Sequence, residues 1–86
     1  MDRMARVIVS DSAAAEFDAL PAVIRIRVQG VFARLADWPA VSGAKPLRGE
    51  LAGNWRIRTG DWRVVFTVAG DTVKVWKIGH RGGVYD

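Results

Sequence analysis

Three arginines in the second half of the chain are spaced so that one surface could hold them all. Strand side chains alternate between the two faces of a sheet, so Arg56 and Arg58 in the segment NWRIRTGDWR share a face. A two-residue Gly-Asp turn would place Arg58 directly opposite Arg63. Like charges paired in this way cost about 0.2–1 kcal/mol, and a bound polyanion would relieve that cost. The spacing therefore predicts a phosphate-binding surface, and an RNA backbone is the ligand we expect.

The segment before these arginines predicts the elements that position them. Residues 6–9 (RVIV) have the composition of a strand. Ser10 or Asp11 then caps a short helix, and Pro21 begins a second one. Gly30 lies inside this second helix at a cost of about 1 kcal/mol relative to alanine, so we expect a close contact with another element there. Helical spacing predicts a buried stripe along the second helix, made of Ile24, Val28, Val31 and Leu35.

Three further strands are predicted at about 54–58, 62–69 and 72–79, joined by two-residue turns. The order β-α-α-β-β-β predicts an α+β fold, an antiparallel-meander sheet with the two N-terminal helices packed on one face. Trp55 and Trp62 alternate with the arginines and are expected to face the core. The arginines are then left on the other face. We expect residues 1–86 to form a single domain.

The charge of the chain is concentrated in the same half. The 86 residues have a formal net charge of +4, and basic and acidic residues balance in the first half, so the whole surplus lies in the second. The chain has no cysteine, which excludes disulfides and thiolate metal sites. No apolar run approaches the roughly 20 residues that span a bilayer, and no secretion signal is recognisable. We therefore expect a cytoplasmic protein with no membrane partner.

Two segments resemble the RelE/ParE superfamily of toxins, and its RelE-like branch in particular. They are KPLRGELAGNWRIRTGDWRVVF (45–66) and VWKIGHRGGVY (75–85). The order of the elements is similar over the whole chain, whereas residues 1–44 are similar in organisation only. The resemblance implies a type II toxin-antitoxin toxin, an mRNA interferase that cleaves mRNA in the ribosomal A site and so inhibits translation. The partners it implies are the 70S ribosome, mRNA and an acidic, partly disordered cognate antitoxin.

The resemblance also implies which residues act. By position, the family's active basic residues and its tyrosine correspond to Arg56, Arg58, Arg63, Arg81 and Tyr85. This sequence has arginine where the family typically has lysine on the second strand. Because arginine is effectively never deprotonated, it can stabilise charge but is a poor general base. His80, the one side chain that titrates near neutrality, is the alternative base.

Cleavage at this surface would proceed by attack of a 2'-hydroxyl on the scissile phosphate. The strand arginines would bind the phosphate and stabilise the negatively charged phosphorane. Arg81 would contact phosphate or assist the leaving group, and Tyr85 would transfer a proton or stack on a base. Lys45, Arg48 and Lys77 would bind RNA through its backbone charge. The sequence offers no carboxylate cluster for a metal, so we expect a metal-independent endoribonuclease with no cofactor.

Structural interpretations of the same residues stay open. Strand arginines often form a solvated surface, Arg81 could cap the end of the sheet, Tyr85 could close the edge of the core, and His80 could be structural. Two other functions stay open as well. One is a ParE-type toxin, which shares the fold, poisons DNA gyrase and lacks the basic catalytic set. The other is a catalytically silent module of the same fold that binds antitoxin or RNA.

Overall fold

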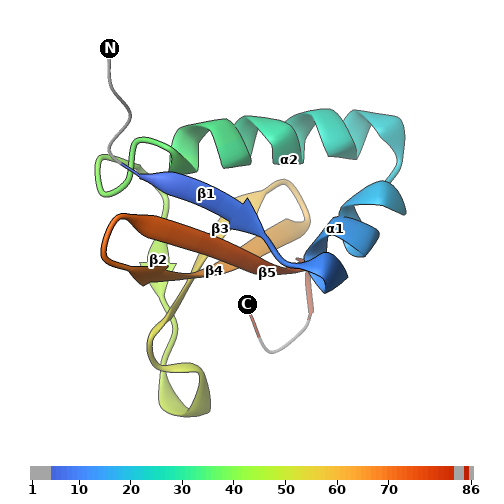
Figure 1. Ribbon diagram of the computed structural model, residues 1–86. Helices are drawn as coiled ribbons and strands as arrows, with labels where there is room; N and C mark the ends of the chain where they lie inside the picture. The colour runs from blue at the N-terminus through green and yellow to red at the C-terminus, as the bar shows by residue number, and fades with distance from the viewer. Residues whose placement is uncertain (1–4, 83–84, 86) are drawn as a thin grey trace.

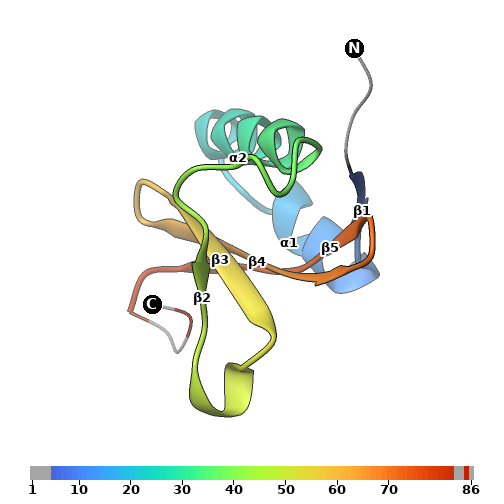
Figure 2. The same ribbon diagram turned by 90° about the vertical axis from the view of Figure 1, so that its left-hand side faces the viewer.

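Two α-helices cover one side of a five-stranded sheet in the computed structural model of the chain, which describes residues 5–82 and 85 (Figure 1). The helices are α1 (Asp11–Asp18) and α2 (Ala22–Leu35), with a short 3-10 helix, η1 (Gly49–Leu51). The strands are β1 (Arg6–Val9), β2 (Lys45–Pro46), β3 (Asn54–Thr59), β4 (Trp62–Ala69) and β5 (Thr72–His80). Figure 2 shows α2 lying across one face of the sheet. The predicted α+β class and order of elements are confirmed, and β2 is a short strand in addition to those predicted.

The sheet is mixed. Its strand order is β1-β5-β4-β3-β2, and β3, β4 and β5 form the predicted antiparallel meander. β1, however, pairs in parallel with β5, with Val7 opposite Val73 and Val9 opposite Val75. The prediction of an antiparallel-meander sheet is therefore correct for the second half of the chain and incomplete for the first. The first and last strands are far apart in the sequence and are not joined by a turn, so no local sequence pattern predicts that they pair.

The two helices begin where the sequence predicts. The Ser10 side chain caps α1, with its Oγ accepting a hydrogen bond from the Ala13 backbone N–H at 3.1 Å. Pro21 precedes α2, whose buried residues are Val28, Val31 and Leu35. The expectation for Gly30 is wrong: a Cβ placed there would meet no atom within 4 Å. The outer side of α2 is exposed at this point, so the glycine serves no packing contact within the chain.

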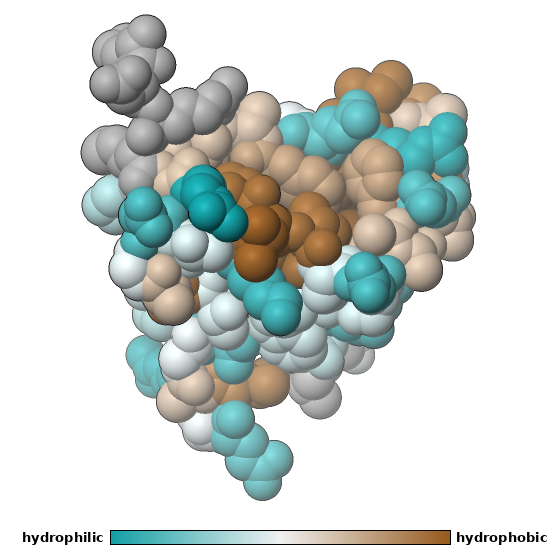
Figure 3. Space-filling model, viewed as in Figure 1, coloured by the Kyte–Doolittle hydropathy of each residue, from teal (hydrophilic) through white to brown (hydrophobic). Residues whose placement is uncertain are grey.

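The core lies between the helices and the sheet. Phe66 is fully buried at its centre and packs edge-on against Trp38, with 5.3 Å between ring centroids. Trp55 and Trp62 pack against the same core, as predicted. Some large apolar side chains remain outside it, and Figure 3 shows apolar surface over β1 near the middle of the view and over the beginning of α2 at the upper right. No helix in the described part of the chain is long and apolar enough to cross a membrane.

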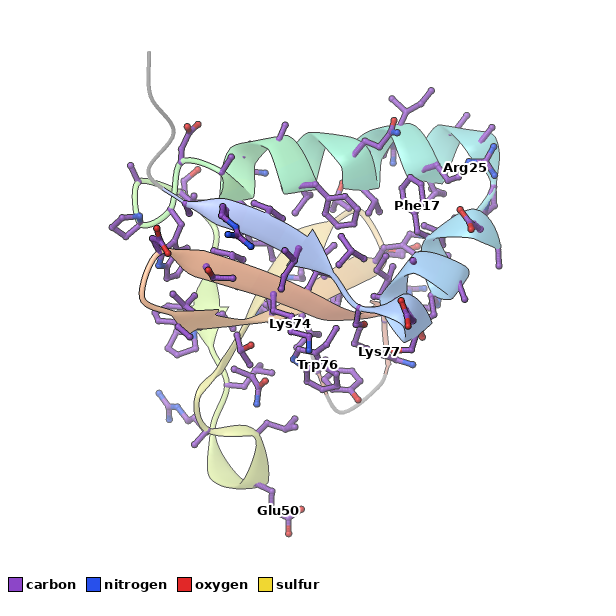
Figure 4. All side chains as sticks on the ribbon, in the orientation of Figure 1. Phe17, Arg25, Glu50, Lys74, Trp76 and Lys77 are labelled. Atoms are coloured by element: carbon purple, nitrogen blue, oxygen red, sulfur yellow. The ribbon has the colours of Figure 1, made fainter. Side chains whose placement is uncertain are left out.

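A β-bulge near the middle of β5 reverses the facing of its second half. Val65 lies opposite Lys77, whereas the next residue, Phe66, lies opposite Val75. Trp76 is therefore the extra residue on β5. Because Val75 and Ile78 both enter the core, Trp76 and Lys77 are turned to the other face. Figure 4 shows Trp76 and Lys77 on the side of β5 away from α2.

Candidate functional site

The open face, by which we mean the sheet face opposite the helices, gathers most of the predicted site residues. Side chains of directly paired residues lie on the same face, so the register defines two rows across it. The first row is Lys45, Arg56, Val65 and Lys77. The second is Arg58, Arg63 and Gly79. The predicted register of the β3–β4 hairpin, with Arg58 opposite Arg63, is confirmed.

The arginines of the open face differ in exposure. Arg58 is exposed, but Arg56 and Arg63 are each only 6 % exposed. A purely solvated surface would leave all three strand arginines exposed, and two of them are buried. Arg63 also contacts its own hairpin, with its Nη1 donating to the Gly60 carbonyl oxygen at 3.3 Å. A buried guanidinium is held in a defined orientation, whereas Arg58 is free to adjust to a ligand.

Tyr85 returns to the open face from the C-terminal segment. Its ring packs edge-on against Trp76, with centroids 5.7 Å apart. Its Cδ2 lies 4.0 Å from the position that a Cβ at Gly79 would occupy. Since Gly79 pairs with Arg63, the tyrosine lies beside the second row. The Trp76 indole is fixed in turn, because its Nε1 donates to Asn54 Oδ1 at 2.9 Å.

Arg81 lies at the end of the sheet beside the β3–β4 turn. Its backbone N–H donates to the Asp61 carbonyl oxygen at 2.7 Å, and its Nε lies 3.7 Å from Asp61 Oδ1. Both side chains of this pair are more than half exposed, so the ion pair is weak and leaves the guanidinium available to a ligand. Arg81, Arg63 and Arg58 thus all lie near one turn.

Lys77 is tied to α1 as well as lying on the open face. Its Nζ donates to Glu16 Oε2 at 2.6 Å, and the other carboxylate oxygen accepts from the Ile78 backbone N–H at 3.0 Å. The hydrogen bond and the charge of Glu16 raise the pKa of Lys77. This lysine therefore stays charged, but part of its charge is already matched by the protein.

His80 lies on the opposite face from the arginine rows. It pairs with Trp62, whose ring it meets edge-on at a centroid distance of 5.0 Å. Trp62 packs on the core side of the sheet, so His80 does not share the open face with the arginines, and the geometry does not support it as the alternative general base there. The bulge and the core contacts of Ile78 decide this facing, and alternation along the sequence could not reveal it.

The two remaining predicted RNA contacts lie toward the β2 edge. Lys45 is exposed and pairs with Arg56 at the end of the first row. Arg48 is exposed just before η1, which projects beyond the sheet at the bottom of Figure 1. Lys45 therefore extends the open face, whereas Arg48 belongs to a separate projection.

Sequence reasoning missed two residues that position this site. Glu16 orients Lys77, and Asn54 orients Trp76. Neither gave a signal, because one lies 61 residues from its partner and the other 22. The assembled open face can bind a phosphate chain through its cations, offer Trp76 and Tyr85 for base stacking, and place a phenol beside bound phosphate.

Comparison with known proteins places this fold in a family. Residues 7–85 match the family described as the ParE toxin of the type II toxin-antitoxin system parDE. The chain is 33 % identical over 67 residues to Toxin RelG of Mycobacterium tuberculosis, an alignment that covers 76 % of each protein. The family match over residues 7–85 includes both helices and the strands that carry the arginines.

Solved structures of similar fold agree with this relationship. The toxin-antitoxin complex RelBE2 from Mycobacterium tuberculosis contains a chain that is 26 % identical, with a TM-score of 0.78 over 90 % of this chain and 98 % of that one. The isolated E. coli RelE toxin has a TM-score of 0.75 at 18 % identity, over 92 % of this chain and 86 % of that one. The latter likeness concerns the fold alone. The chain therefore belongs to the RelE/ParE superfamily and is a toxin of a type II toxin-antitoxin system.

Proposed function

We propose that this toxin is a ribosome-dependent endoribonuclease that cleaves mRNA in the A site and thereby inhibits translation. The observation that carries the proposal is the cross-strand pair of Arg58 and Arg63 on the open face. Two guanidinium groups opposite each other destabilise a hairpin, and a phosphate between them would remove that cost. The 33 % identity to Toxin RelG supports the RelE-like branch.

The proposed chemistry divides the open-face residues by exposure. Arg58 and Arg81 are exposed and would contact the scissile phosphate and the leaving group. Arg56 and Arg63, held in place by burial, would supply fixed positive charge as the phosphorane forms. With His80 on the other face, Tyr85 is the group that we propose for proton transfer. Its phenol oxygen would accept the 2'-hydroxyl proton while its own proton passes to a phosphate oxygen, from which the 5'-oxygen leaving group takes it. These steps require no metal ion.

The partner that we propose is a cognate antitoxin with an acidic, partly disordered segment. Two similar solved structures are toxin–antitoxin complexes, the RelBE2 complex of Mycobacterium tuberculosis and the RelE–RelB complex of Pyrococcus horikoshii OT3. A basic surface, on a molecule that also exposes apolar side chains, suits a segment that folds on binding. Among the described residues, the exposed large apolar ones are Ile8, Val23 and Ile26. We place the toxin, its antitoxin and the ribosome together in the cytoplasm.

A ParE-type activity is the second candidate. The observation in its favour is the match of residues 7–85 to the ParE toxin family. A ParE-type toxin would poison DNA gyrase and would leave mRNA intact. The paired arginines and the adjacent tyrosine weigh toward the nuclease, because gyrase poisoning needs no phosphorane-stabilising set.

The decisive experiment is primer extension on an mRNA after the purified toxin is mixed with programmed 70S ribosomes. Cuts at A-site codons that require ribosomes are the expected result. The matched control contains the same mRNA and toxin without ribosomes. Intact mRNA combined with gyrase-linked DNA breaks in cells would assign the toxin to the ParE type. Intact mRNA without such breaks would indicate a silent binding module.

A further inference from the structure

Arg27 of α2 lies at the β3–β4 turn, although it is distant in sequence from every predicted site residue. A Cβ built at Gly60 would lie 3.4 Å from Arg27 Nη1. The Arg63 Nη1 donates to the carbonyl oxygen of the same glycine at 3.3 Å. The two guanidinium groups therefore approach one residue, and their Nη1 atoms lie no more than about 10 Å apart given the size of that residue.

Four elements contribute to what we call the turn arginine cluster. Its members are Arg27 from α2, Arg58 from β3, Arg63 from β4 and Arg81 just after β5. Arg58 lies directly opposite Arg63, and Arg81 donates its backbone N–H to Asp61 in the turn. Three of the four, Arg27, Arg58 and Arg81, are exposed to solvent. The turn itself contributes one carboxylate, Asp61, at 3.7 Å from Arg81.

Placing several arginines around one turn costs more electrostatic free energy than placing them apart on a solvated helix surface would. The Debye length at physiological salt is about 8 Å, and like charges closer than this repel one another. The upper bound of about 10 Å places Arg27 and Arg63 at the edge of that range. Arg27 could extend into solvent, yet it lies against a turn that the guanidinium groups of Arg63 and Arg81 already approach. A run of neighbouring phosphates would match such a set of planar, bidentate donors.

We propose that Arg27 binds a backbone phosphate of RNA next to the one on the open face, so that the strand passes over the Gly60–Asp61 turn toward α2. The inference rests on the proposed function, and it adds a helix residue to the RNA path. The turn arginine cluster spans the open face and α2 and has four guanidinium groups for one carboxylate, Asp61, which favours RNA over an acidic peptide as the occupant. The phosphate could belong to the message or to ribosomal RNA, which present the same chemistry.

The test compares Arg27→Gln with Arg25→Gln, both in the full chain. Arg25 is a matched control because it lies two residues away, on the other side of α2, where its Nη1 donates to the Leu20 carbonyl oxygen at 2.9 Å. Figure 4 shows Arg25 at the corner between α1 and α2. Glutamine retains helix propensity close to that of arginine, so both variants should fold. Equal thermal midpoints of the purified variants would verify this.

Binding is measured by anisotropy over a series of salt concentrations, with a single-stranded RNA oligonucleotide, vacant 70S ribosomes and programmed 70S ribosomes as probes. For Arg27→Gln we expect the slope of log K against log salt on the oligonucleotide to fall by about 0.7, the value for one lost phosphate contact on a single strand. Affinity at low salt should fall about two- to fivefold. Arg25→Gln should keep the wild-type slope, and Arg27→Lys, which retains the charge, should restore it.

A slope for Arg27→Gln that is unchanged on the oligonucleotide and on both kinds of ribosome, in a toxin that still cleaves mRNA on ribosomes, would overturn this inference and leave the proposed function intact. A wild-type protein that neither cleaves mRNA nor binds RNA would overturn both. A fall in the salt slope that is equally large on vacant and on programmed ribosomes would assign the phosphate to ribosomal RNA. A loss confined to the oligonucleotide and programmed ribosomes would assign it to the message. If Arg27→Gln weakened the binding of an acidic peptide and left the RNA slopes unchanged, the occupant would be a protein partner and not RNA.

Discussion

Arg58 and Arg63 face each other across the β3–β4 hairpin, but their different exposure makes them different targets for mutation. Arg63 is only 6 % exposed, so its removal disturbs packing as well as charge. Arg58 is exposed, so its removal reports on the ligand alone. Arg58 is therefore the better residue to substitute first.

Arg58→Ala should lower ribosome-dependent cleavage about 10²- to 10³-fold, because it removes one preorganised charge from the phosphorane. Its free energy of unfolding should stay within about 0.5 kcal/mol of wild type or rise slightly, since a like-charge pair is relieved. Single-turnover cleavage and urea unfolding measure the two effects. Arg6→Ala removes an exposed cation from β1 and should retain full activity. Wild-type cleavage by Arg58→Ala would contradict the proposed role.

Tyr85→Phe separates proton transfer from stacking. The phenylalanine ring would keep the edge-on contact with Trp76 and lose only the hydroxyl. If Tyr85 transfers a proton, cleavage should fall about 10²- to 10⁴-fold with little change in thermal stability. Activity equal to wild type would instead assign the ring to base stacking, which Tyr85→Ala would then abolish.

Two glycines on different elements should respond to alanine in opposite ways. Gly30 of α2 has open space around its missing Cβ, so Gly30→Ala should stabilise the protein by about 1 kcal/mol and raise Tm by about 4–8 °C. Gly60, in the β3–β4 turn, has φ +61° and lies against Arg27. Gly60→Ala should therefore cost about 1–2 kcal/mol. Thermal unfolding of both variants measures this, and a destabilised Gly30→Ala would show that the helix has no room there.

The link between α1 and β5 predicts a dependence on alkaline pH. Because Glu16 raises the pKa of Lys77 above 10.5, the folded state holds this proton more tightly than the unfolded chain does. The contribution is fully present below pH 10.5 and is lost as the pH rises through the higher folded pKa. The Lys77 side chain is 36 % exposed, so solvent screening keeps the effect modest.

Glu16→Gln is the matched variant for this effect, since its amide oxygen can still accept from the Ile78 N–H. As the pH rises above 10.5, the free energy of unfolding should fall more steeply for wild type than for Glu16→Gln. Urea unfolding at a series of pH values measures the difference. Parallel curves for the two proteins would show that the ion pair adds nothing to stability.

At the scale of the whole molecule, the single core between helices and sheet sets the stability. Phe66 is fully buried and touches Trp38, so Phe66→Ala should cost about 3–5 kcal/mol. A domain of this size has a total of only about 5–10 kcal/mol, so the variant should lose most of its resistance to urea. Val23→Ala removes a side chain that is 62 % exposed and should change stability by less than about 0.5 kcal/mol. A small loss for Phe66→Ala would mean that the core can repack.

The local features of this fold could be predicted from sequence because each depends on neighbouring residues. The Gly-Asp turn at residues 60–61 fixes the opposition of Arg58 and Arg63. Ser10 caps α1 and Pro21 separates the two helices for the same local reasons. The RelE/ParE superfamily was predicted from the resemblance of segments 45–66 and 75–85. The open-face positions of Arg56, Arg58 and Arg63 followed from strand alternation alone.

The tertiary structure decided what local spacing could not. Pairing of β1 with β5 and the bulge at Trp76 both arise from long-range contacts, and the bulge sends His80 away from the open face. Burial of Arg56 and Arg63 depends on what covers a sheet face. The approach of Arg27 to Gly60 depends on how α2 crosses that sheet. Sequence periodicity assigns a side chain to one face of its own element, and only the packing of elements determines what it meets there.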